Sequence, residues 1–280
     1  MRAPTIGESF WLEGQVAVGG QAAEHRPESA STAEPAGPSN AGPGPDDLAQ
    51  QPQGPAAADP DRAGYDQLVS ALIPGYASLA RLAVALLAAS PLASAAGAAV
   101  LVAGCGTGAE LLEARAQRPD WQLTGLDPSP AMLSLAQQRL DPAVAIHWRC
   151  CKVEEIGNDR LFDGALAVLV LQSLPDDGTK LGFLSALARL LRPGGQLVLV
   201  DLMRPERSSL QEQVAQAWLG FQRASGLEAA PGGGGEALGD TWHPIGPARL
   251  TALLDAAGFG DPALIFQALN FAGYLVQRRA

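Results

Sequence analysis

The sequence contains few cysteines and few basic residues. Only three of its 280 residues are cysteine, and two of these, Cys150 and Cys151, are adjacent, so the chain has no disulfide framework of the kind found in small secreted proteins. The 19 lysines and arginines are outnumbered by 29 aspartates and glutamates, and the formal net charge is −10. Because no basic run offsets this charge, a nucleic acid is an unfavourable partner, and a small molecule or a peptide fits better.

The chain also lacks a long apolar run and a targeting signal. The stretch Leu79–Ala99 is rich in alanine but carries Arg81 and Pro91, so it does not predict a membrane-spanning helix. The N-terminal region has no apolar segment of the signal-peptide type, and we expect a cytoplasmic protein. Residues 1–63 are rich in Pro, Gly, Ala, Ser and Gln, which predicts a disordered, low-complexity tail. Residues 64–280 then predict one globular domain.

What the sequence does contain is a glycine-rich motif after an apolar run. The run Val100–Ala103 leads into Gly104, Gly106 and Gly108 and then into a helix-forming segment. This pattern predicts a buried parallel strand, a tight turn and a helix whose N-terminus lies against a ligand. A second apolar strand ends at Asp127, about twenty residues further on, where a carboxylate can accept hydrogen bonds from ribose hydroxyls. The spacing predicts a nucleoside site and fits either a nicotinamide dinucleotide or S-adenosylmethionine (SAM).

Three later segments follow in an order that favours SAM. Ser129-Pro130 can cap and start a helix, Phe162–Val170 predicts a buried strand, and Leu191–Gly195 is a helix stop followed by the strand Gln196–Asp201. Together with the glycine motif and Asp127, these segments resemble the class I SAM-dependent methyltransferase superfamily from about residue 64 onward. The resemblance implies an α/β fold: a doubly wound, mostly parallel, Rossmann-like sheet of seven strands with an antiparallel last strand and an N-terminal helical cover.

A closer resemblance is to the carboxy-SAM synthase-like subgroup. It is carried by Ile73–Tyr76, Ser129–Met132, Leu171-Gln172 and Phe266–Phe271. Members of that subgroup use prephenate to attach a carboxyl group to the sulfonium methyl of SAM, and they hold the new carboxylate with an arginine after the fifth strand. The corresponding residues here, 231–236, contain no cation, so an added carboxylate would be unpaired in a partly buried site. This departure favours plain SAM chemistry unless Arg223 or Arg249 replaces the missing charge.

The hydrophobic pattern predicts alternating strands and helices. Strands are expected near 98–103, 121–126, 143–149, 163–169 and 195–201, and helices near 108–117, 130–140, 178–191 and 247–257. Two earlier helices, divided at Pro74-Gly75, are expected to cover the cofactor site. Residues 206–246 predict a helical and glycine-rich insertion over the acceptor site, and residues 263–276 predict two strands joined by a tight connection. Such alternation implies right-handed crossovers and a parallel sheet.

The resemblance implies a SAM-dependent methyltransferase that acts on a small molecule or a modified peptide by in-line transfer from the sulfonium. Such a transfer depends mainly on alignment, and a base is needed only if the acceptor must lose a proton. With the glycine motif, the resemblance gives these expected cofactor-binding residues: Tyr65, Tyr76, Gly104, Cys105, Gly106, Thr107, Gly108, Asp127, Pro128, Met132, Cys151, Val153, Val168 and Leu169.

Several of these residues also have a purely structural interpretation. Met132 fits a core methionine as well as a contact to adenine. Cys151 occupies the place where many relatives have an acidic residue that contacts adenine, but the two adjacent cysteines also fit buried apolar residues. His243 is the candidate base, although a histidine packed against Trp242 fits too. No ligand cluster has zinc-type spacing, so no metal is expected.

Three alternatives to a methyltransferase stay open. The first is a carboxy-SAM synthase-like enzyme, and the second is a non-catalytic SAM-binding protein that acts as a scaffold through its long tail. The third is a nicotinamide dehydrogenase, because Gly104, Gly106 and Ala109 also satisfy the loose dinucleotide pattern.

Overall fold

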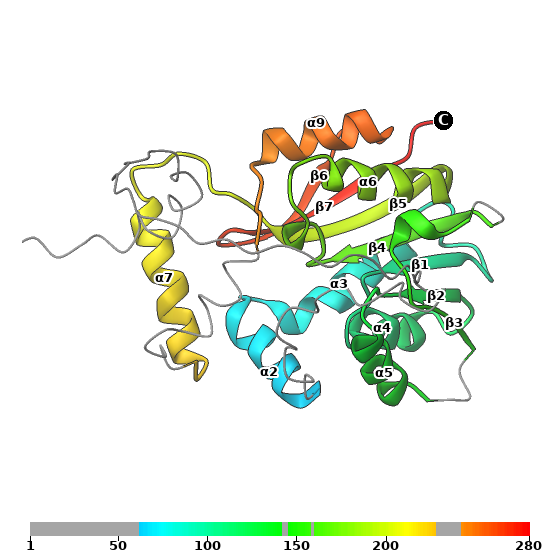
Figure 1. Cartoon of the computed structure of the whole chain (residues 1–280), viewed down its shortest axis with the longest axis horizontal. Coiled ribbons are helices and arrows are strands. Elements are labelled where there is room, and N and C mark those ends of the chain that lie inside the picture. The colour runs from blue at the N-terminus through cyan, green and yellow to red at the C-terminus, as the bar shows by residue number, and fades with distance from the viewer. Residues whose placement is uncertain (1–61, 142–144, 158–159, 228–241) are drawn as a thin grey trace, which may run out of the picture. The chain divides into compact units, whose positions relative to one another are not determined.

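The computed structural model describes residues 62–141, 145–157, 160–227 and 242–280 (Figure 1). Seven strands form one sheet in the order β3-β2-β1-β4-β5-β7-β6. Their bounds are β1 Ala99–Ala103, β2 Gln122–Leu126, β3 Ile146–Arg149, β4 Phe162–Val168, β5 Leu191–Leu202, β6 Ala263–Ala268 and β7 Phe271–Gln277. The predicted tail, residues 1–63, lies outside the described residues except at its end, so its disorder stays a prediction.

The strand directions confirm the predicted fold class. Strands β1 to β5 pair in parallel, and β7 runs antiparallel to both β5 and β6. The expected strand pair within residues 263–276 is therefore β6 and β7. An antiparallel β7 also separates this sheet from the classic dinucleotide-binding sheet, whose sixth strand stays parallel.

Helices cover both faces of the sheet (Figure 1). Their bounds are α2 Arg62–Leu72, α3 Tyr76–Ala88, α4 Ala109–Gln117, α5 Pro130–Arg139, α6 Thr179–Leu190, α7 Gln211–Ala224 and α9 Pro247–Ala257, with short 3-10 turns η1 Val153–Glu155 and η2 Leu171–Ser173. Helices α3, α4 and α5 pack on one face, and α6 and α9 pack on the other. The helices predicted from periodicity are all present within a few residues of their expected ends.

The central strand β1 explains why this arrangement needs an unbroken apolar run. All five of its residues are buried, because helices cover it on both sides. Val100 and Val102 point into the core under α3 and α4, whereas Leu101 and Ala103 point into the core under α6 and α9. Each fully buried valine or leucine contributes about 1.5–3 kcal/mol to stability, so the strand is anchored from both faces.

The N-terminal helices and the insertion pack on each other near the C-terminal ends of the strands. Helices α2 and α3 are divided at Pro74-Gly75 as predicted, and Gly75 begins the second helix with a left-handed φ of +83°. The indole N–H of Trp218 on α7 donates to the carbonyl oxygen of Leu72 at 2.6 Å. The same ring meets Phe271 edge to face, with 5.7 Å between ring centroids. The glycine-rich part of the predicted insertion, residues 228–241, lies outside the described residues.

Strand β5 begins earlier than predicted. The segment Leu191–Gly195, expected as a helix stop before a strand near residue 195, already belongs to β5. Leu191 pairs with Phe162, and a register shift then brings Gln196 opposite Gly164. The paired glycines that indicate a helix stop also permit a bulge at the start of a strand, and the sequence pattern does not separate the two.

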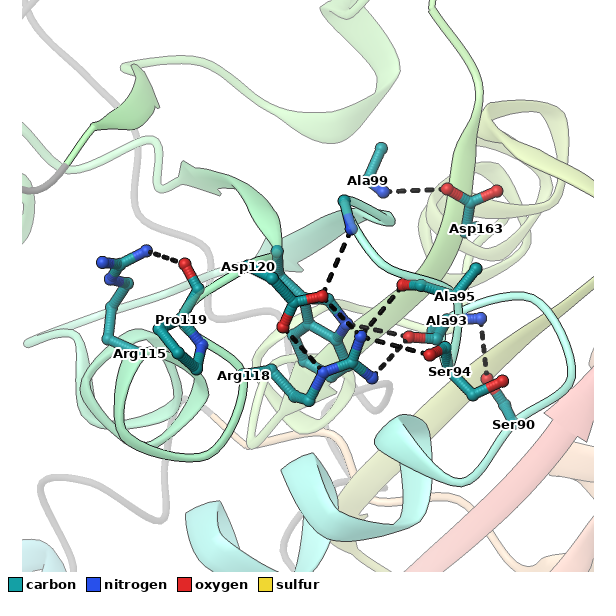
Figure 2. A network of polar contacts seen from close by, with 12 residues as sticks. Ser90, Ala93, Ser94, Ala95, Ala99, Arg115, Arg118, Pro119, Asp120 and Asp163 are labelled. Carbon is teal, nitrogen blue, oxygen red and sulfur yellow. Dashed lines mark hydrogen bonds and ion pairs between the residues drawn. The ribbon is translucent and has the colours of Figure 1, made fainter.

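An arginine fixes the loop between α3 and β1 (Figure 2). The Arg118 guanidinium donates to three backbone carbonyls in residues 93–95 at 2.9–3.2 Å and pairs with Asp120 at 2.7 Å. It also stacks on Trp121, 5.0 Å from the ring centroid. This network lies where β1 starts, so it holds the N-terminal end of that strand, opposite the end that leads into the glycine motif.

Within the described part of the chain, no single helix is long and apolar enough to cross a membrane. Only Gly64–Leu72 and Tyr76–Ala88 taken together reach that length and composition, and they are bent by 87° with respect to each other.

Candidate functional site

The three motif glycines all adopt left-handed backbone conformations but face different surroundings. Their φ angles are +67° at Gly104, +48° at Gly106 and +84° at Gly108. A Cβ atom at Gly104 would lie 2.5 Å from Cγ2 of Val170, and one at Gly108 would lie 3.1 Å from Cβ of Ala136. A Cβ atom at Gly106 would meet no heavy atom within 4 Å. Two glycines therefore permit close packing of the protein on itself, and Gly106 faces space that a ligand can enter.

Asp127 lies at the end of β2 and joins the glycine loop to helix α5. Its side chain is buried, with 8% of the residue exposed. One carboxylate oxygen accepts the Gly106 N–H at 3.0 Å, and the other accepts the Ser129 N–H at 2.9 Å. The Ser129 hydroxyl in turn caps α5 by accepting the Met132 N–H. Each Asp127 oxygen keeps the capacity to accept a further hydrogen bond from a ligand hydroxyl.

Helix α2 is fastened over the glycine loop by polar contacts. The Thr107 hydroxyl donates to Asp66 at 2.8 Å, and Arg139 of α5 pairs with the other oxygen of the same carboxylate at 2.9 Å. These three side chains come from α2, the loop and α5, which the sequence alone does not bring together. The contacts close one side of the site.

Glu110 is a second buried carboxylate at the site, and it was not predicted from the sequence. It lies in the first turn of α4 with 6% of the residue exposed. Burial raises its pKa to about 7, against smaller opposing effects of the hydrogen bond from its own backbone N–H and of Arg139. Its only sequence signal is an acidic residue in the first turn of a helix, which is ordinarily interpreted as a favourable partner of the helix dipole.

Tyr65 and Tyr76 lie beside these carboxylates. Burial raises the pKa of both phenols, and the neighbouring carboxylates raise it further: Asp127 and Glu110 at Tyr65, and Glu110 at Tyr76. The two tyrosines come from α2 and α3, the predicted helical cover. The structure thus brings the predicted cover residues to the glycine loop and the β2 carboxylate.

Two predicted residues lie at the end of β4, and the backbone of one of them is strained. Val168 and Leu169 are half-buried, and Leu169 has a φ of +60°, which is rare for a residue with a branched side chain. Its N–H donates to the Val200 carbonyl at 2.7 Å, and the next residue, Val170, is the one that approaches Gly104. Such strain persists only where surrounding contacts determine it.

Those contacts come from a buried polar cluster at the end of β5. The Asp201 carboxylate accepts the N–H groups of Leu171 at 2.6 Å, Gln172 at 2.8 Å and Leu202 at 3.0 Å. The fully buried Lys180 donates to the Leu171 carbonyl. Burial raises the pKa of Asp201 to about 7 and lowers the pKa of Lys180. The cluster holds the turn after β4 against β5 and thereby fixes one wall of the site.

His243, the candidate base, joins the site through its backbone. Its N–H donates to the carbonyl of Gln172 at 2.6 Å, which places the residue beside the turn after β4. Its side chain is exposed and lies near enough to Asp177 to lower the pKa of that carboxylate, after the larger effect of Thr179. Trp242 is half-buried against the core.

The other predicted cofactor residues differ in exposure. Pro128 is exposed, and Met132 and Cys151 are half-buried. Cys105 and Val153 are each 2% exposed and pack in the core, and burial raises the pKa of the Cys105 thiol.

One structural interpretation was wrong. Cys150 is exposed and Cys151 is only half-buried, so the adjacent cysteines are not both core residues. They follow β3, an edge strand whose side chains alternate between half-buried and exposed. Of the two arginines considered for an added carboxylate, Arg249 pairs with Asp176 at 2.9 Å and Arg223 is exposed on α7.

Comparisons with known proteins relate part of the chain to methyltransferases. A family model described as a methyltransferase domain matches residues 101–197. The chain is 37% identical over 112 residues to a demethylmenaquinone methyltransferase of Tropheryma whipplei (strain Twist), covering 40% of this chain and 45% of that protein. It is 37% identical over 110 residues to a ubiquinone biosynthesis O-methyltransferase of Bradyrhizobium diazoefficiens, covering 39% and 42% respectively. The chain thus spans less than half the length of these curated relatives.

A solved structure extends the likeness to most of the described chain. An amino pentose methyltransferase from Micromonospora echinaspora, solved with SAM bound, superposes with a TM-score of 0.52 at 20% identity, covering 76% of this chain and 96% of that one. At this identity the likeness concerns the fold. Together with the strand order, it shows that the chain has the fold of a SAM-bound methyltransferase, and the family match places a methyltransferase domain in residues 101–197.

Proposed function

We propose that the protein is a SAM-dependent methyltransferase that acts on a small molecule. The observation that carries the proposal is the pair formed by Asp127 and Gly106: a buried carboxylate accepts the N–H of the glycine that faces open space, at the ends of two adjacent parallel strands. A carboxylate in this place is suited to ribose hydroxyls, and a loop without side chains is suited to close approach of a ligand. The names of the two relatives, which concern demethylmenaquinone and ubiquinone biosynthesis, support a small-molecule acceptor.

The residues around this pair fit the cofactor. Asp127 has accepting capacity left for the ribose, and the exposed Pro128 and half-buried Met132 flank the start of α5, where the adenine would lie. Cys105 and Val153 are buried, so we propose that they contribute through backbone groups and by shaping the floor. Bound SAM supplies a methyl group already activated by its sulfonium.

The chain's own contribution is binding and alignment. Alignment of an acceptor with the reacting bond supplies on the order of 7–11 kcal/mol, which requires rigid walls. The Asp201 cluster holds the turn that bears Val168 and Leu169, and Tyr65 and Tyr76 cover the other side. For an acceptor that must lose a proton, we propose His243 as the base, because its backbone is tied to the same turn.

Aromatic side chains favour an acceptor with a flat apolar part. Phe221 of α7, Trp242 before α9 and Phe266 of β6 are half-buried and pack against the core that Tyr65 and Tyr76 also join. Aromatic surfaces of this kind stack on flat rings and exclude water from the reacting groups. A modified peptide is the alternative acceptor, and labelling distinguishes the two.

Calorimetry with SAM and S-adenosylhomocysteine tests the cofactor assignment. We expect micromolar binding by the wild type and a loss of about 1.5–3 kcal/mol in Asp127→Ala, the range for a charged hydrogen bond. Asp163→Asn is the matched control, since Asp163 accepts the Ala99 N–H at 2.8 Å where β1 and β4 start, at the other end of the strands from Asp127. Unchanged affinity in a folded Asp127→Ala protein would remove the ribose assignment, and NADH binding in place of SAM would favour the dehydrogenase alternative.

The acceptor and the remaining alternatives need two further measurements. Incubation with labelled SAM and a cell extract shows which small molecule or peptide gains the label, and retained cofactor with no labelled acceptor supports a non-catalytic role. Mass spectrometry of the copurified ligand separates SAM from carboxy-SAM by the added carboxyl mass.

A further inference from the structure

A cavity opens at the C-terminal end of β5, separate from the candidate cofactor site. Its volume is about 780 Å³, within the range of pockets that hold small molecules. Its walls come from the segment after β5, the starts of α7 and α9, and the β6–β7 hairpin. None of the residues expected to bind the cofactor lines it, and β4 lies between β5 and the strand that leads into the glycine loop. The cavity is therefore a second place where a ligand can enter.

One wall of the cavity is apolar and belongs to the β6–β7 hairpin. Leu264 and Tyr274 lie opposite each other on the two strands, and Leu264 is 54% exposed although it is apolar. Leu269 occupies the first position of the two-residue turn that joins the strands, with a φ of +54°. Such a position favours glycine, asparagine or aspartate, so a leucine is unfavourable for the turn itself. Its side chain adds apolar surface to the cavity.

Tyr274 places a polar group in this apolar wall. The residue is 7% exposed and lines the cavity. Among the described residues, none hydrogen-bonds to its hydroxyl, and the hydroxyl is not sealed off from solvent. Burial raises the pKa of the phenol, and the nearby Glu206 carboxylate raises it further. The phenol is therefore protonated at neutral pH and can donate a hydrogen bond to a ligand.

Two opposite charges line the same cavity without pairing with each other. In the part of the chain that the structure describes, neither Arg204 nor Glu206 forms an ion pair. Arg249 holds the pKa of Asp176 down through two hydrogen bonds at 2.9 and 3.0 Å, and Arg204 adds a smaller effect from further away. Asp176 is thus engaged elsewhere. A ligand with one charge would complement only one of the two lining groups, whereas a ligand with both charges complements both.

We propose that this cavity binds a small zwitterion of the amino-acid type with an apolar side chain. Its carboxylate pairs with the Arg204 guanidinium, which is suited to bidentate contacts, and its ammonium pairs with Glu206. Its side chain lies on the leucines of the hairpin, and the Tyr274 hydroxyl donates to its carboxylate. The inference does not depend on the proposed function, because no residue of the candidate cofactor site takes part in it.

Three ligands of similar shape test the two charges separately. L-Phenylalanine carries both charges, phenylpropionate carries only the carboxylate, and phenylethylamine carries only the ammonium. By calorimetry at pH 7.5, the wild type should bind L-phenylalanine most tightly. Arg204→Gln should weaken the binding of L-phenylalanine and phenylpropionate by about 2- to 5-fold, the range for an exposed ion pair, and leave phenylethylamine unchanged. Glu206→Gln should weaken the binding of L-phenylalanine and phenylethylamine to a similar extent and leave phenylpropionate unchanged.

Four further variants provide the controls and test the apolar wall. Arg207→Gln and Glu212→Gln remove exposed charges that are close in sequence but do not line the cavity, so they should change no affinity. Tyr274→Phe keeps the aromatic ring and should weaken L-phenylalanine binding by about 2- to 10-fold, the range for a neutral hydrogen bond. Leu264→Ser changes a side chain that is largely exposed and should weaken the binding of all three ligands alike.

S-adenosylhomocysteine separates this cavity from the cofactor site. It contains an amino acid part, so it would displace any L-phenylalanine bound in the cofactor site. Unchanged L-phenylalanine binding under saturating S-adenosylhomocysteine supports the second site, and displacement overturns it. The inference is also overturned if the wild type binds L-phenylalanine no more tightly than the singly charged ligands, or if the control variants weaken binding as much as the Arg204 and Glu206 variants do. If S-adenosylhomocysteine does not bind at all, the proposed function fails, and the charge variants still decide this inference.

Discussion

Replacing Gly104 by alanine tests the packing of the glycine loop against the turn after β4. The φ of +67° makes alanine unfavourable by about 1–2 kcal/mol. The new Cβ atom would lie 2.5 Å from Cγ2 of Val170, well inside contact distance, and overpacking of this kind typically costs about 1–3 kcal/mol. We expect Gly104→Ala to lose about 2–5 kcal/mol of unfolding free energy, a large share of the stability of a typical domain.

Two further variants divide this loss into its parts. Gly106→Ala carries similar backbone strain but meets no neighbour, so it should lose only about 1–2 kcal/mol while reducing cofactor affinity. Adding Val170→Ala to Gly104→Ala should recover the steric part, about 1–3 kcal/mol, as a favourable coupling in a double-mutant cycle. Urea unfolding followed by tryptophan fluorescence measures the wild type, the three single variants and the double variant under one condition.

Two results would refute this reasoning. Equal losses in Gly104→Ala and Gly106→Ala would mean that backbone strain alone decides both. An additive cycle with Val170→Ala would mean that the loop and the turn do not press on each other. Either result would also remove the link between Leu169 and the glycine loop on which one wall of the site depends.

Further perturbations test the remaining contacts. Asp201→Asn places an amide N–H against backbone N–H donors and should lose about 1–3 kcal/mol in urea unfolding. Burial raises the pKa values of Asp201 and Glu110 to about 7, above the value of about 4 for an unfolded chain. Their contribution to the unfolding free energy is therefore full below about pH 4 and is lost as the pH rises through 7. The fall in unfolding free energy between these pH values should be smaller in Asp201→Asn than in the wild type. Trp218→Phe leaves the Leu72 carbonyl without its indole donor and should lose about 1–2 kcal/mol in the same assay. Arg118→Ala should lower the melting temperature and the unfolding free energy, the latter by about 1–3 kcal/mol. It should leave S-adenosylhomocysteine affinity unchanged, because its contacts lie before the start of β1, at the other end of the strand from the glycine loop.

The framework of the site was predictable because local sequence patterns determine its strands and turns. The run before Gly104 is apolar throughout and the run before Asp127 is buried from Leu123 onward, and the structure pairs them as adjacent parallel strands, β1 and β2. Buried parallel strands need such runs, and the turns between strand and helix need glycine or a capping residue such as Ser129. Strand order follows from this alternation with few alternatives.

The contacts that complete the site were not predictable in this way. Asp66 meets Thr107 across 41 positions and Arg139 across 73, and no periodicity relates residues so far apart. Glu110 and Lys180 look like solvent-facing helix residues in sequence, yet both are buried because α2 and the turn after β4 cover them. Charged residues are almost never fully buried without a partner, so their residue type predicts that Glu110 and Lys180 are exposed.

The reversed direction of β7 determines at which end a tag can be attached without approaching the cofactor site. Because β7 runs against the parallel strands, it carries the C-terminal residues back to the start of β5, where the Gly194 N–H donates to the Arg278 carbonyl. The glycine loop and Asp127 follow the C-terminal ends of β1 and β2, at the opposite end of the parallel strands. An affinity tag or a surface-coupling group attached after Ala280 would thus project away from the cofactor, whereas one attached just before Arg62 would emerge beside the helix that closes over it.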